Sequence, residues 1–432
     1  MKHFSNNIRL LLTLFALFIV KTLFSCSMYK VTANGKTMVG NNEDSWRHDA
    51  TIWFESGKNG QFGLVCVGYK GKPHPDGAMN EHGLTFDAFS MPYKPNIPPR
   101  NPKKKDFAYS QLKSLMQQCK TVDEVYAQLK KLNLHILNGS ILFNGGMLLF
   151  VDKSGKYLVV EASKMTFGDD AKFPLANFSI ADAKSLKSIQ LERYRKGVTF
   201  LSNKQLTSTL SFCEKLSDTM SVNREKIGDG TLYTTIYDME EGMVHLYFFH
   251  DFQKRISFDL KEELKKGSHS YLMAELFPNN TNYQRFLNYK TPQNNKTIFL
   301  YLIACGGLFL FSSIYYVIRF IKTFSTPKSL IKLGLSIFSF AFAIYSYVLL
   351  RNEGIYYFSS PYVDAHSLLV SMTSYLPFLL LILIIPMILQ MVKLYKSKSR
   401  NRNTLLLVTV NNCAYIVLIG LFAYWELFGT FG

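Results

Sequence analysis

The sequence predicts an α+β domain, with two β-sheets packed face to face and helices outside, followed by an all-α transmembrane domain. Up to residue 276, segments of alternating apolar residues are grouped around helical segments, a pattern typical of α+β proteins. Four apolar runs follow residue 296, each near the roughly 20 residues that a spanning helix needs. We therefore divide the chain into a leader (1–25), an α+β domain (26–276), a tether (277–296) and a membrane domain (297–432).

The first residues of the chain have the parts of a secretory leader. A basic start with Lys2 and Arg9 precedes a short apolar stretch, and the small residue Ser25 stands directly before Cys26. The apolar stretch is too short to span a bilayer comfortably, so we expect a cleaved signal peptide at residues 1–25. Alternatively, Leu-Phe-Ser-Cys resembles a bacterial lipobox, in which case Cys26 would carry lipid.

The α+β domain begins with a predicted β-hairpin that starts at Cys26. Apolar residues alternate in segments 27–33 and 36–41, and the Asn34-Gly35 dipeptide between them is typical of a two-residue turn. The same alternation predicts further strands in residues 51–56, 62–70, 80–92, 145–163, 231–240 and 242–252.

Helical periodicity appears in three segments, residues 109–119, 121–132 and 185–201. Thr121 is the expected N-cap of the second helix. Residues 92–107 are rich in Pro and Lys, so we expect a surface loop without regular structure there.

The membrane domain is predicted to contain four helices, at residues 297–318, 333–350, 367–392 and 404–428. The first and third connections carry several Lys and Arg residues, whereas the second is aromatic and has Arg351 as its single cation. Short cytoplasmic loops carry the positive excess. We therefore expect these two connections in the cytoplasm and the α+β domain on the extracytoplasmic side.

The formal net charge of +18 is spread over the whole chain. Ten cations and three anions fall in the membrane domain and three cations in the leader, which leaves about +8 on the exported part. A solvated basic surface, or a weak attraction to anionic lipid headgroups, accounts for this charge without nucleic acid. The six cysteines have no spacing typical of a zinc site or of a disulfide framework, so we expect neither.

Removal of the leader would make Cys26 the first residue of the mature protein. A thiol nucleophile and a free α-amine would then share one residue, and the amine can serve as the general base of the thiol. A thiol–imidazole dyad is an alternative that needs no free amine. Four motifs follow in order: Gly-Asn-Asn-Glu-Asp at 40–44, Asn-Glu-His-Gly-Leu at 80–84, Leu-Ala-Asn at 175–177 and Glu-Arg-Tyr at 192–194.

In their order and spacing these motifs resemble the choloylglycine hydrolase and acid amidase group of N-terminal-nucleophile hydrolases, over most of residues 26–260. The resemblance implies a four-layer αββα fold and hydrolysis of linear amides outside peptide chains. It makes Cys26 the nucleophile and Asp44 the carboxylate that orients the α-amine and the thiol. It also implies that Asn177 is a donor of the oxyanion hole and that Arg193 is the cation near the thiolate.

Two positions depart from the pattern of that family. Asn41 stands where the family usually has Arg, so this position supplies no positive charge to hold a thiolate. Ser90 aligns with a second oxyanion residue, which is Asn in bile-salt hydrolases. A backbone N–H or the Ser90 hydroxyl would have to replace that amide.

The resemblance implies an amidase that hydrolyses a non-peptide amide through a thioester on Cys26, with no cofactor and no metal. The leader and the four apolar runs add the expectation that this enzyme is membrane-anchored and extracytoplasmic. The expected partners are the lipid bilayer and a small amphiphilic amide: an N-acyl amino acid, a bile-salt-like or penicillin-like amide, or an N-acyl lipid amide. Nucleic acid is not an expected partner.

Three alternatives to this enzyme stay open. The first is an inactive exported binding module, favoured by Asn41 and Ser90, and the second is a lipoprotein with a lipidated Cys26. The third is a membrane protein whose four helices are the functional part, although the absence of a charged residue at the centre of any predicted span argues against transport.

Overall fold

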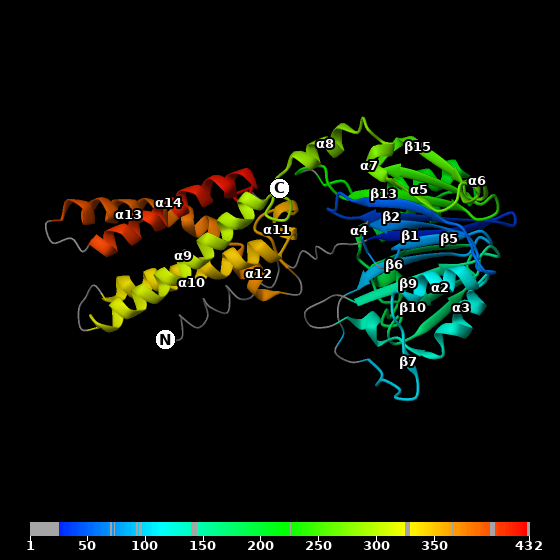
Figure 1. Cartoon of the computed structure of the whole chain (residues 1–432), viewed down its shortest axis with the longest axis horizontal. Helices are drawn as coiled ribbons and strands as arrows, with labels where there is room; N and C mark the ends of the chain where they lie inside the picture. Colours follow the sequence, from blue (N-terminus) through cyan, green and yellow to red (C-terminus); the bar gives the residue numbers. More distant parts are fainter. Residues whose placement is uncertain are drawn as a thin grey trace. The chain divides into compact units, whose positions relative to one another are not determined.

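The computed structural model describes residues 26–69, 71–72, 74–91, 94, 97–139, 145–224, 226–324, 329–364, 367–397 and 402–429. The predicted leader lies outside the described residues. The chain separates into two compact units with the boundary between Leu287 and Asn288. Figure 1 shows the elements of both units.

A six-stranded antiparallel sheet holds the two strands of the predicted N-terminal hairpin. Its strands lie in the order β12-β1-β2-β13-β14-β15. Their bounds are β1 (Ser27–Ala33), β2 (Lys36–Asp44), β12 (Lys172–Ala176), β13 (Thr231–Asp238), β14 (Met243–Phe248) and β15 (Asp251–Asp259).

An eight-stranded antiparallel sheet contains most of the other predicted strands, in the order β11-β10-β9-β6-β5-β4-β3-β16. Their bounds are β3 (Ala50–Glu55), β4 (Leu64–Tyr69), β5 (Gly77–Asn80), β6 (Thr85–Met91), β9 (Gly145–Val151), β10 (Tyr157–Val160), β11 (Met165–Gly168) and β16 (His269–Leu272).

Helices cover the outer faces of both sheets. These helices are α2 (Gln111–Gln118), α3 (Val122–Leu129), α4 (Glu192–Asn203) and α5 (Leu210–Met220). The first two share an apolar core with Leu148 and Phe150 of the eight-stranded sheet. The last two share a separate core with Tyr29 and Ile236 of the six-stranded sheet. The N-terminal unit is therefore an α+β domain with the four αββα layers that were predicted, and Figure 1 shows the stacked strands between the outer helices.

Strand β2 is covered on both faces, by helices on one side and by the second sheet on the other. Apolar residues such as Met38 and Val39 fill both sides, since successive side chains of a strand point to opposite faces. The polar residues that end the strand, from Asn41 to Asp44, are buried as well. A buried polar strand end of this kind is the place where an interior site is expected.

The structure confirms the predicted hairpin and the predicted helix cap. The two residues of the turn, Asn34 and Gly35, both have positive φ, 52° and 74°, as a tight hairpin turn requires. The Thr121 side chain accepts a hydrogen bond from the backbone N–H of Glu124 and begins α3.

Two other expectations are wrong in part. In the segment 185–201, a single 3-10 turn, η2 (Leu186–Ser188), is followed by extended backbone, and α4 begins only at Glu192. Leu186 is 41% exposed, so this periodic stretch has no core against which a helix could pack. Within the segment 92–107, Lys105–Asp106 forms the short strand β7, which pairs with β8 (Leu132–Asn133).

Several elements had no counterpart among the expected ones. They are the strands β8, β11, β12 and β16, most of β15, and the helices α5, η1 (His135–Asn138), α6 (Leu260–Lys265), α7 (Met273–Leu276) and α8 (Thr281–Asn288).

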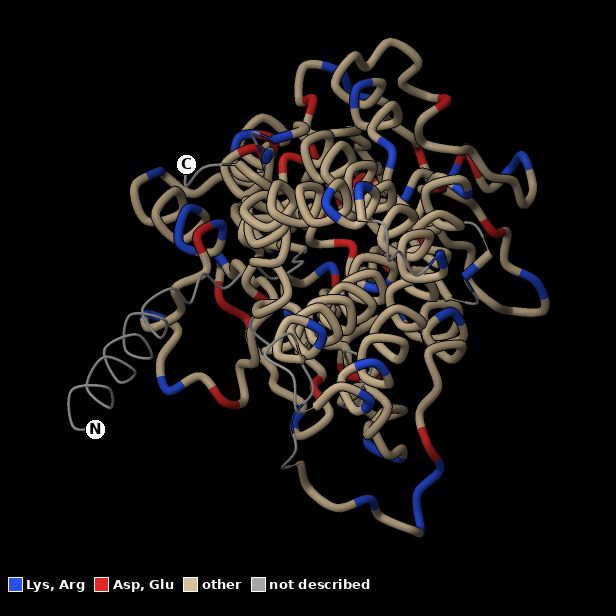
Figure 2. The backbone as a smooth tube through the Cα atoms, turned by 90° about the vertical axis from the view of Figure 1, so that its left-hand side faces the viewer, with Lys and Arg blue, Asp and Glu red and all other residues tan. Residues whose placement is uncertain are grey.

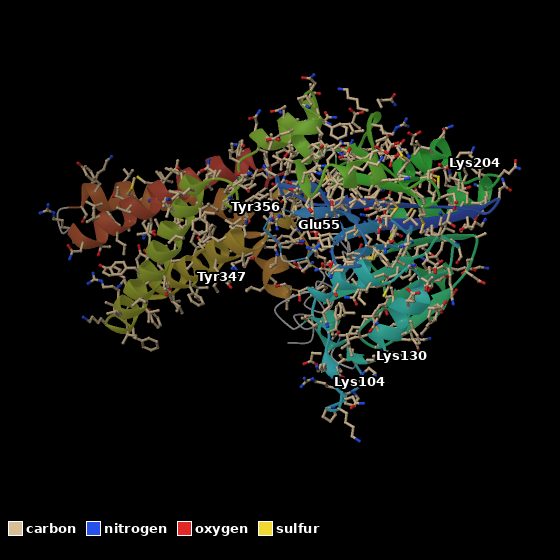
Figure 3. All side chains as sticks on the ribbon, turned by 45° about the vertical axis from the view of Figure 1, so that its right-hand side comes forward. Glu55, Lys104, Lys130, Lys204, Tyr347 and Tyr356 are labelled. Atoms are coloured by element: carbon tan, nitrogen blue, oxygen red, sulfur yellow. The ribbon has the colours of Figure 1, made fainter. Side chains whose placement is uncertain are left out.

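Figure 2 marks the positions of Lys and Arg and of Asp and Glu along the backbone, and the two kinds are interspersed. Lys156 pairs with Asp123 at 2.7 Å, and Lys113 pairs with Glu55. In Figure 3, Lys104 and Lys130 lie close together where Lys104 Nζ donates to the Lys130 carbonyl oxygen at 2.7 Å. Acidic partners thus offset part of the positive charge of the N-terminal unit.

Among the residues that the structure describes, the C-terminal unit contains four helical segments that are long and apolar enough to cross a membrane. They are α9 (Lys296–Ile321), α10 (Ser329–Arg351), α12 (Leu368–Thr373) continued by α13 (Leu376–Lys396), and α14 (Arg402–Tyr424), with the short α11 (Gly354–Tyr357) after α10. This finding confirms a long apolar helix at each of the four predicted spans, whereas their orientation stays a prediction.

The surface and the interior of this helical unit differ in chemistry. Large apolar side chains point outward, among them Ile382, which is 70% exposed, as expected for contact with lipid. Inside, Phe309 stacks on Tyr415 with ring centroids 4.6 Å apart. Asn411 Nδ2 of α14 donates to Ser312 Oγ of α9 at 2.8 Å, so a buried polar pair ties two helices together.

Candidate functional site

The register of β1 places Cys26 between two strands at one end of the six-stranded sheet. Ser27 pairs with Asn42 of β2 on one side and with Ala176 of β12 on the other. One residue earlier in the chain, Cys26 therefore lies opposite Glu43 and Asn177. Its side chain is 8% exposed.

Glu43 is the direct partner of the Cys26 thiol. The thiol donates to Glu43 Oε2 with an Sγ–O distance of 2.8 Å, and the Tyr69 hydroxyl donates to Glu43 Oε1 at 3.1 Å. No functional role was assigned to Glu43 from the sequence. The signal was present, because a two-residue turn that pairs residue 33 with residue 36 also brings residue 43 opposite residue 26.

Burial and nearby carboxylates control the protonation of this pair. Desolvation raises the pKa of the Cys26 thiol well above its ordinary value, and the negative charges of Glu43 and Asp44 raise it further. Desolvation, followed by the charge of Asp76, raises the pKa of Glu43 from 4.5 to about 8. The carboxyl group of Glu43 therefore keeps its proton to a higher pH than an ordinary glutamate does.

Asp44 and Arg193 form the charged surroundings of the thiol. Thr231 Oγ1 donates to Asp44 Oδ1 at 2.7 Å, while burial raises the pKa of Asp44 and the positive charges of Arg193 and Arg224 oppose this rise. Desolvation lowers the pKa of Arg193, and Asp44 and Cys26 act in the opposite direction. Arg193 thus lies near enough to both residues for its charge to act on them.

The two candidate oxyanion residues are joined by a hydrogen bond. Asn177 Nδ2 donates to the backbone carbonyl oxygen of Ser90 at 2.7 Å, whereas the Ser90 side chain is exposed. Asn177 Oδ1 is buried and has no hydrogen-bond partner within the described part of the chain. The structure therefore brings Asn177 and Ser90 together beside β1, with the carbonyl group of Ser90 as the contact.

Asn41 occupies the interior of β2 without a polar partner. It is 1% exposed, and neither of its amide atoms has a hydrogen-bond partner among the described residues. It lies opposite Met28 and Thr235, on the face of the sheet that also carries Cys26. Asn41 thus contributes an uncharged amide to the layer between the sheets.

The described residues contain neither an imidazole hydrogen-bonded to the Cys26 thiol nor a group of His, Cys, Asp and Glu side chains able to hold a metal ion. His245 instead bonds to Ser257 Oγ at 2.8 Å. The partner that the structure gives the thiol is a carboxylate.

Residues 28–168 match the family model of linear amide C-N hydrolases, choloylglycine hydrolase family. Among solved structures, a mutant of conjugated bile acid hydrolase from Clostridium perfringens is 16% identical, with a TM-score of 0.44, over 57% of this chain and 96% of that one. Penicillin V acylase from Agrobacterium tumefaciens is 13% identical, with a TM-score of 0.41, over 57% and 90% of the two chains. No curated protein matches the chain.

Proposed function

We propose that the chain is a membrane-anchored cysteine amidase of the choloylglycine hydrolase family of linear amide C-N hydrolases, whose family model matches residues 28–168. It hydrolyses a non-peptide linear amide through a thioester on Cys26. The observation that carries the proposal is the position of one thiol at the start of β1, opposite Asn177 and within the electrostatic reach of Arg193.

The proposed reaction begins when removal of the leader frees the α-amine of Cys26. A base of the site takes the thiol proton, and the thiolate attacks the amide carbonyl carbon with Arg193 and Asp44 as the charged groups beside it. Asn177, fixed by its bond to the Ser90 carbonyl, donates to the developing oxyanion. The base returns this proton to the departing amine as the C–N bond breaks, and water then hydrolyses the thioester and restores the thiol.

The membrane part is proposed to anchor the enzyme with its N-terminal unit on the extracytoplasmic side. This orientation is supported by the basic residues at the ends of two helices: Arg319 and Lys322 close α9, and Lys393 and Lys396 close α13. An amphiphilic amide, with a hydrophobic acyl part, is the substrate class that suits an enzyme attached to a bilayer.

An inactive binding module is the second candidate, and one observation favours it. Asn41 is buried beside the site and carries no charge, so the thiolate has one cation fewer than the family pattern provides. A lipid-modified Cys26 would lead to the same loss of activity.

The test uses the full-length protein purified from membranes. Its N-terminal sequence and mass are determined first, because an unmodified Cys26 start supports the enzyme and a diacylglyceryl adduct contradicts it. The protein is then incubated with a conjugated bile salt, penicillin V, an N-acylethanolamine and an acyl-homoserine lactone. The proposal expects amine release from at least one amide and an acyl adduct on the Cys26 peptide.

Two variants complete this test. Cys26→Ala should abolish both the adduct and the turnover. The matched control, Cys213→Ala, removes a thiol that is buried between α5 and the six-stranded sheet, and it should leave the adduct at Cys26 in place. Turnover that survives Cys26→Ala would overturn the proposal.

A further inference from the structure

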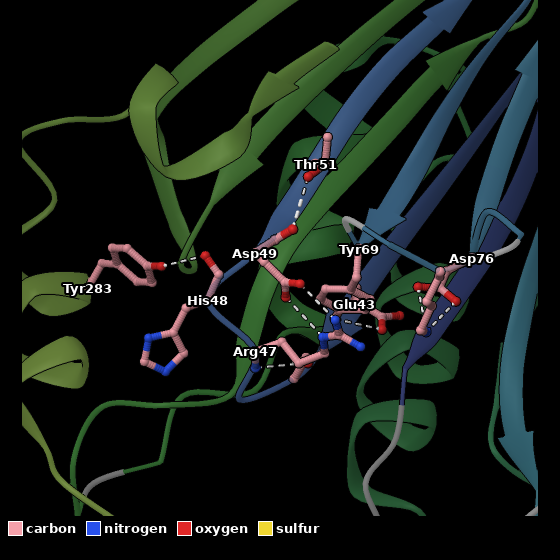
Figure 4. A network of polar contacts seen from close by, with 10 residues as sticks. Glu43, Arg47, His48, Asp49, Thr51, Tyr69, Asp76 and Tyr283 are labelled. Carbon is pink, nitrogen blue, oxygen red and sulfur yellow. Dashed lines mark hydrogen bonds and ion pairs between the residues drawn. The ribbon is translucent and has the colours of Figure 1, made fainter. Parts of the chain in front are cut away.

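A hydrogen-bonded chain of three side chains leads from the buried thiol toward the surface. Cys26 Sγ donates to one oxygen of Glu43, and the Tyr69 hydroxyl donates to the other oxygen. Tyr69 also lines an open cavity of about 550 Å³, together with Trp53 and Lys72. Figure 4 shows Glu43 beside Tyr69 at the centre of this network.

Two cations hold the ring of Tyr69 in place. The Arg47 guanidinium lies 4.5 Å from the ring centroid, and Lys72 Nζ lies 4.7 Å from it. Each cation has a carboxylate partner of its own, Asp49 at 2.7 Å and Asp76 at 2.8 Å. The phenol is therefore fixed between charged groups, with its hydroxyl directed at Glu43.

The groups that act on Glu43 come from several elements. Its pKa is raised to about 8 by burial and by Asp76, and is lowered by its bonds to Cys26 and Tyr69 and by the charge of Lys72. Asp87 of β6 and Tyr233 of β13 also interact electrostatically with it. Among these groups, Glu43 is the one that is hydrogen-bonded to the sulfur of Cys26.

We propose that Glu43 is a catalytic residue that takes the thiol proton of Cys26 and passes it to the departing amine, with Tyr69 as its positioning residue. This inference rests on the proposed amide hydrolysis and assigns its proton transfer. The S–H bond breaks, an O–H bond forms on Glu43 Oε2, and the electron pair stays on sulfur. Sulfur then bonds to the carbonyl carbon, and the proton moves to nitrogen as the C–N bond breaks, which restores the Glu43 carboxylate.

Charge balance within the pair favours this transfer. The charge of Glu43 is, after desolvation, the largest cause of the raised pKa of the thiol. Transfer neutralises Glu43 at the moment when the thiolate forms, so that repulsion disappears, while the positive charge of Arg193 remains to stabilise the thiolate.

The test compares an amide with the p-nitrophenyl ester of the same acyl group, because the ester leaving group needs no proton. In Glu43→Gln, amide turnover should fall by about 10²- to 10⁴-fold, the usual contribution of a general acid–base group, and ester turnover should fall much less. If Glu43 only keeps the thiol protonated, the substitution accelerates both reactions, which would overturn the inference.

Two further variants separate the hydrogen bond from the charge. Asp87→Asn removes a carboxyl group that raises the thiol pKa without bonding to the thiol, and it should retain amide turnover. Tyr69→Phe removes the hydroxyl bonded to Glu43 and should shift the pH midpoint of amide turnover. An unchanged midpoint in Tyr69→Phe contradicts the inference even if Glu43→Gln fails to fold.

Alkylation of Cys26 by iodoacetamide, followed on its peptide by mass spectrometry, needs no substrate. In the wild type, the alkylation rate should rise with pH to a plateau, with a midpoint near pH 8 that is set by Glu43. In Glu43→Gln, the rate should rise with pH without that plateau. If the wild type and Glu43→Gln show the same dependence of alkylation rate on pH, the inference about Glu43 is overturned and the proposed function is not affected. A wild type with the predicted profile that hydrolyses no amide overturns the proposed function and leaves the thiol–carboxyl pair established.

Discussion

Asn177→Ala offers a sharp test of the oxyanion role, because its expected effects on stability and on catalysis differ in size. In the folded protein the side chain makes one hydrogen bond, from Nδ2 to the Ser90 carbonyl oxygen. Losing one neutral hydrogen bond costs about 1 kcal/mol of folding free energy. Losing an oxyanion donor raises the barrier by about 3 kcal/mol, or about 10²- to 10³-fold in kcat.

Asn80→Ala is the matched control. It changes the same residue type in the same unit, but it should cost more folding stability and less kcat than Asn177→Ala. Asn80 Nδ2 donates to the carbonyl oxygens of Met116 and Cys119, both at 2.8 Å, and Oδ1 accepts from the N–H groups of His82 and Leu84. At about 1 kcal/mol for each bond, its loss should cost several kcal/mol of stability. It should leave kcat per folded molecule almost unchanged.

The assay measures kcat from amine release and unfolding free energy from hydrogen exchange of the β1 and β2 peptides. Asn177→Ala should lose most of its kcat with little loss of protection, and Asn80→Ala should show the reverse. The reasoning is refuted if Asn177→Ala keeps kcat within a few-fold of wild type, or if both variants lose activity in proportion to their stability.

Three further predictions concern packing, pH and the membrane helices. In Gly40→Ala the new Cβ would lie 2.2 Å from Cζ of Tyr29, so we expect about 1–3 kcal/mol of destabilisation. This loss should appear as faster amide hydrogen exchange in β2, and exchange as slow as in the wild type would contradict the clash. The pKa of Glu43 is raised to about 8, so the folded state retains a proton that the unfolded chain loses near pH 4.5. The free energy of unfolding of the wild type should therefore fall as the pH rises from 4.5 to about 8, and that of Glu43→Gln should change less, as measured by hydrogen exchange at fixed denaturant. Parallel curves of unfolding free energy against pH for the two proteins would argue against the raised pKa. Asn411→Leu breaks the pair with Ser312, so the SDS concentration at the midpoint of unfolding should fall by an amount equivalent to about 0.6–2 kcal/mol, and an unmoved midpoint would mean that the pair contributes no stability.

Local signals in the sequence were sufficient for much of the fold. The Asn34-Gly35 turn and the alternation on either side of it predict β1 and β2, and Thr121 predicts the start of α3, because each depends on neighbouring residues only. The periodicity of residues 185–191 misled the prediction, since Leu186 has no core to cover. Whether a periodic segment forms a helix depends on the tertiary contacts that cover its apolar face, and one sequence does not display these contacts.

In the candidate site, too, some residues could be predicted from local sequence and others depend on tertiary structure. Asp44, Asn177 and Arg193 were selected through motifs, and the structure brings them to the neighbourhood of Cys26. Glu43 belongs to the same motif as Asp44, but the motif assigns it no role. Its contact with the thiol follows from strand register and from burial. A motif indicates which residue types occur at a spacing, whereas pairing decides which side chain meets the sulfur.

The two-residue turn between β1 and β2 makes hairpin length a determinant of chemistry. Deleting Ala33 and Lys36 together would shorten both strands and keep residue 26 opposite residue 43. Deleting Lys36 alone, with the turn retained, would set Asp44 opposite Cys26 and rotate every later side chain of β2 to the other face. Homologous hairpins that differ by an even number of residues can therefore share one reaction, while an odd difference must be absorbed by a bulge or must give the nucleophile a new neighbour.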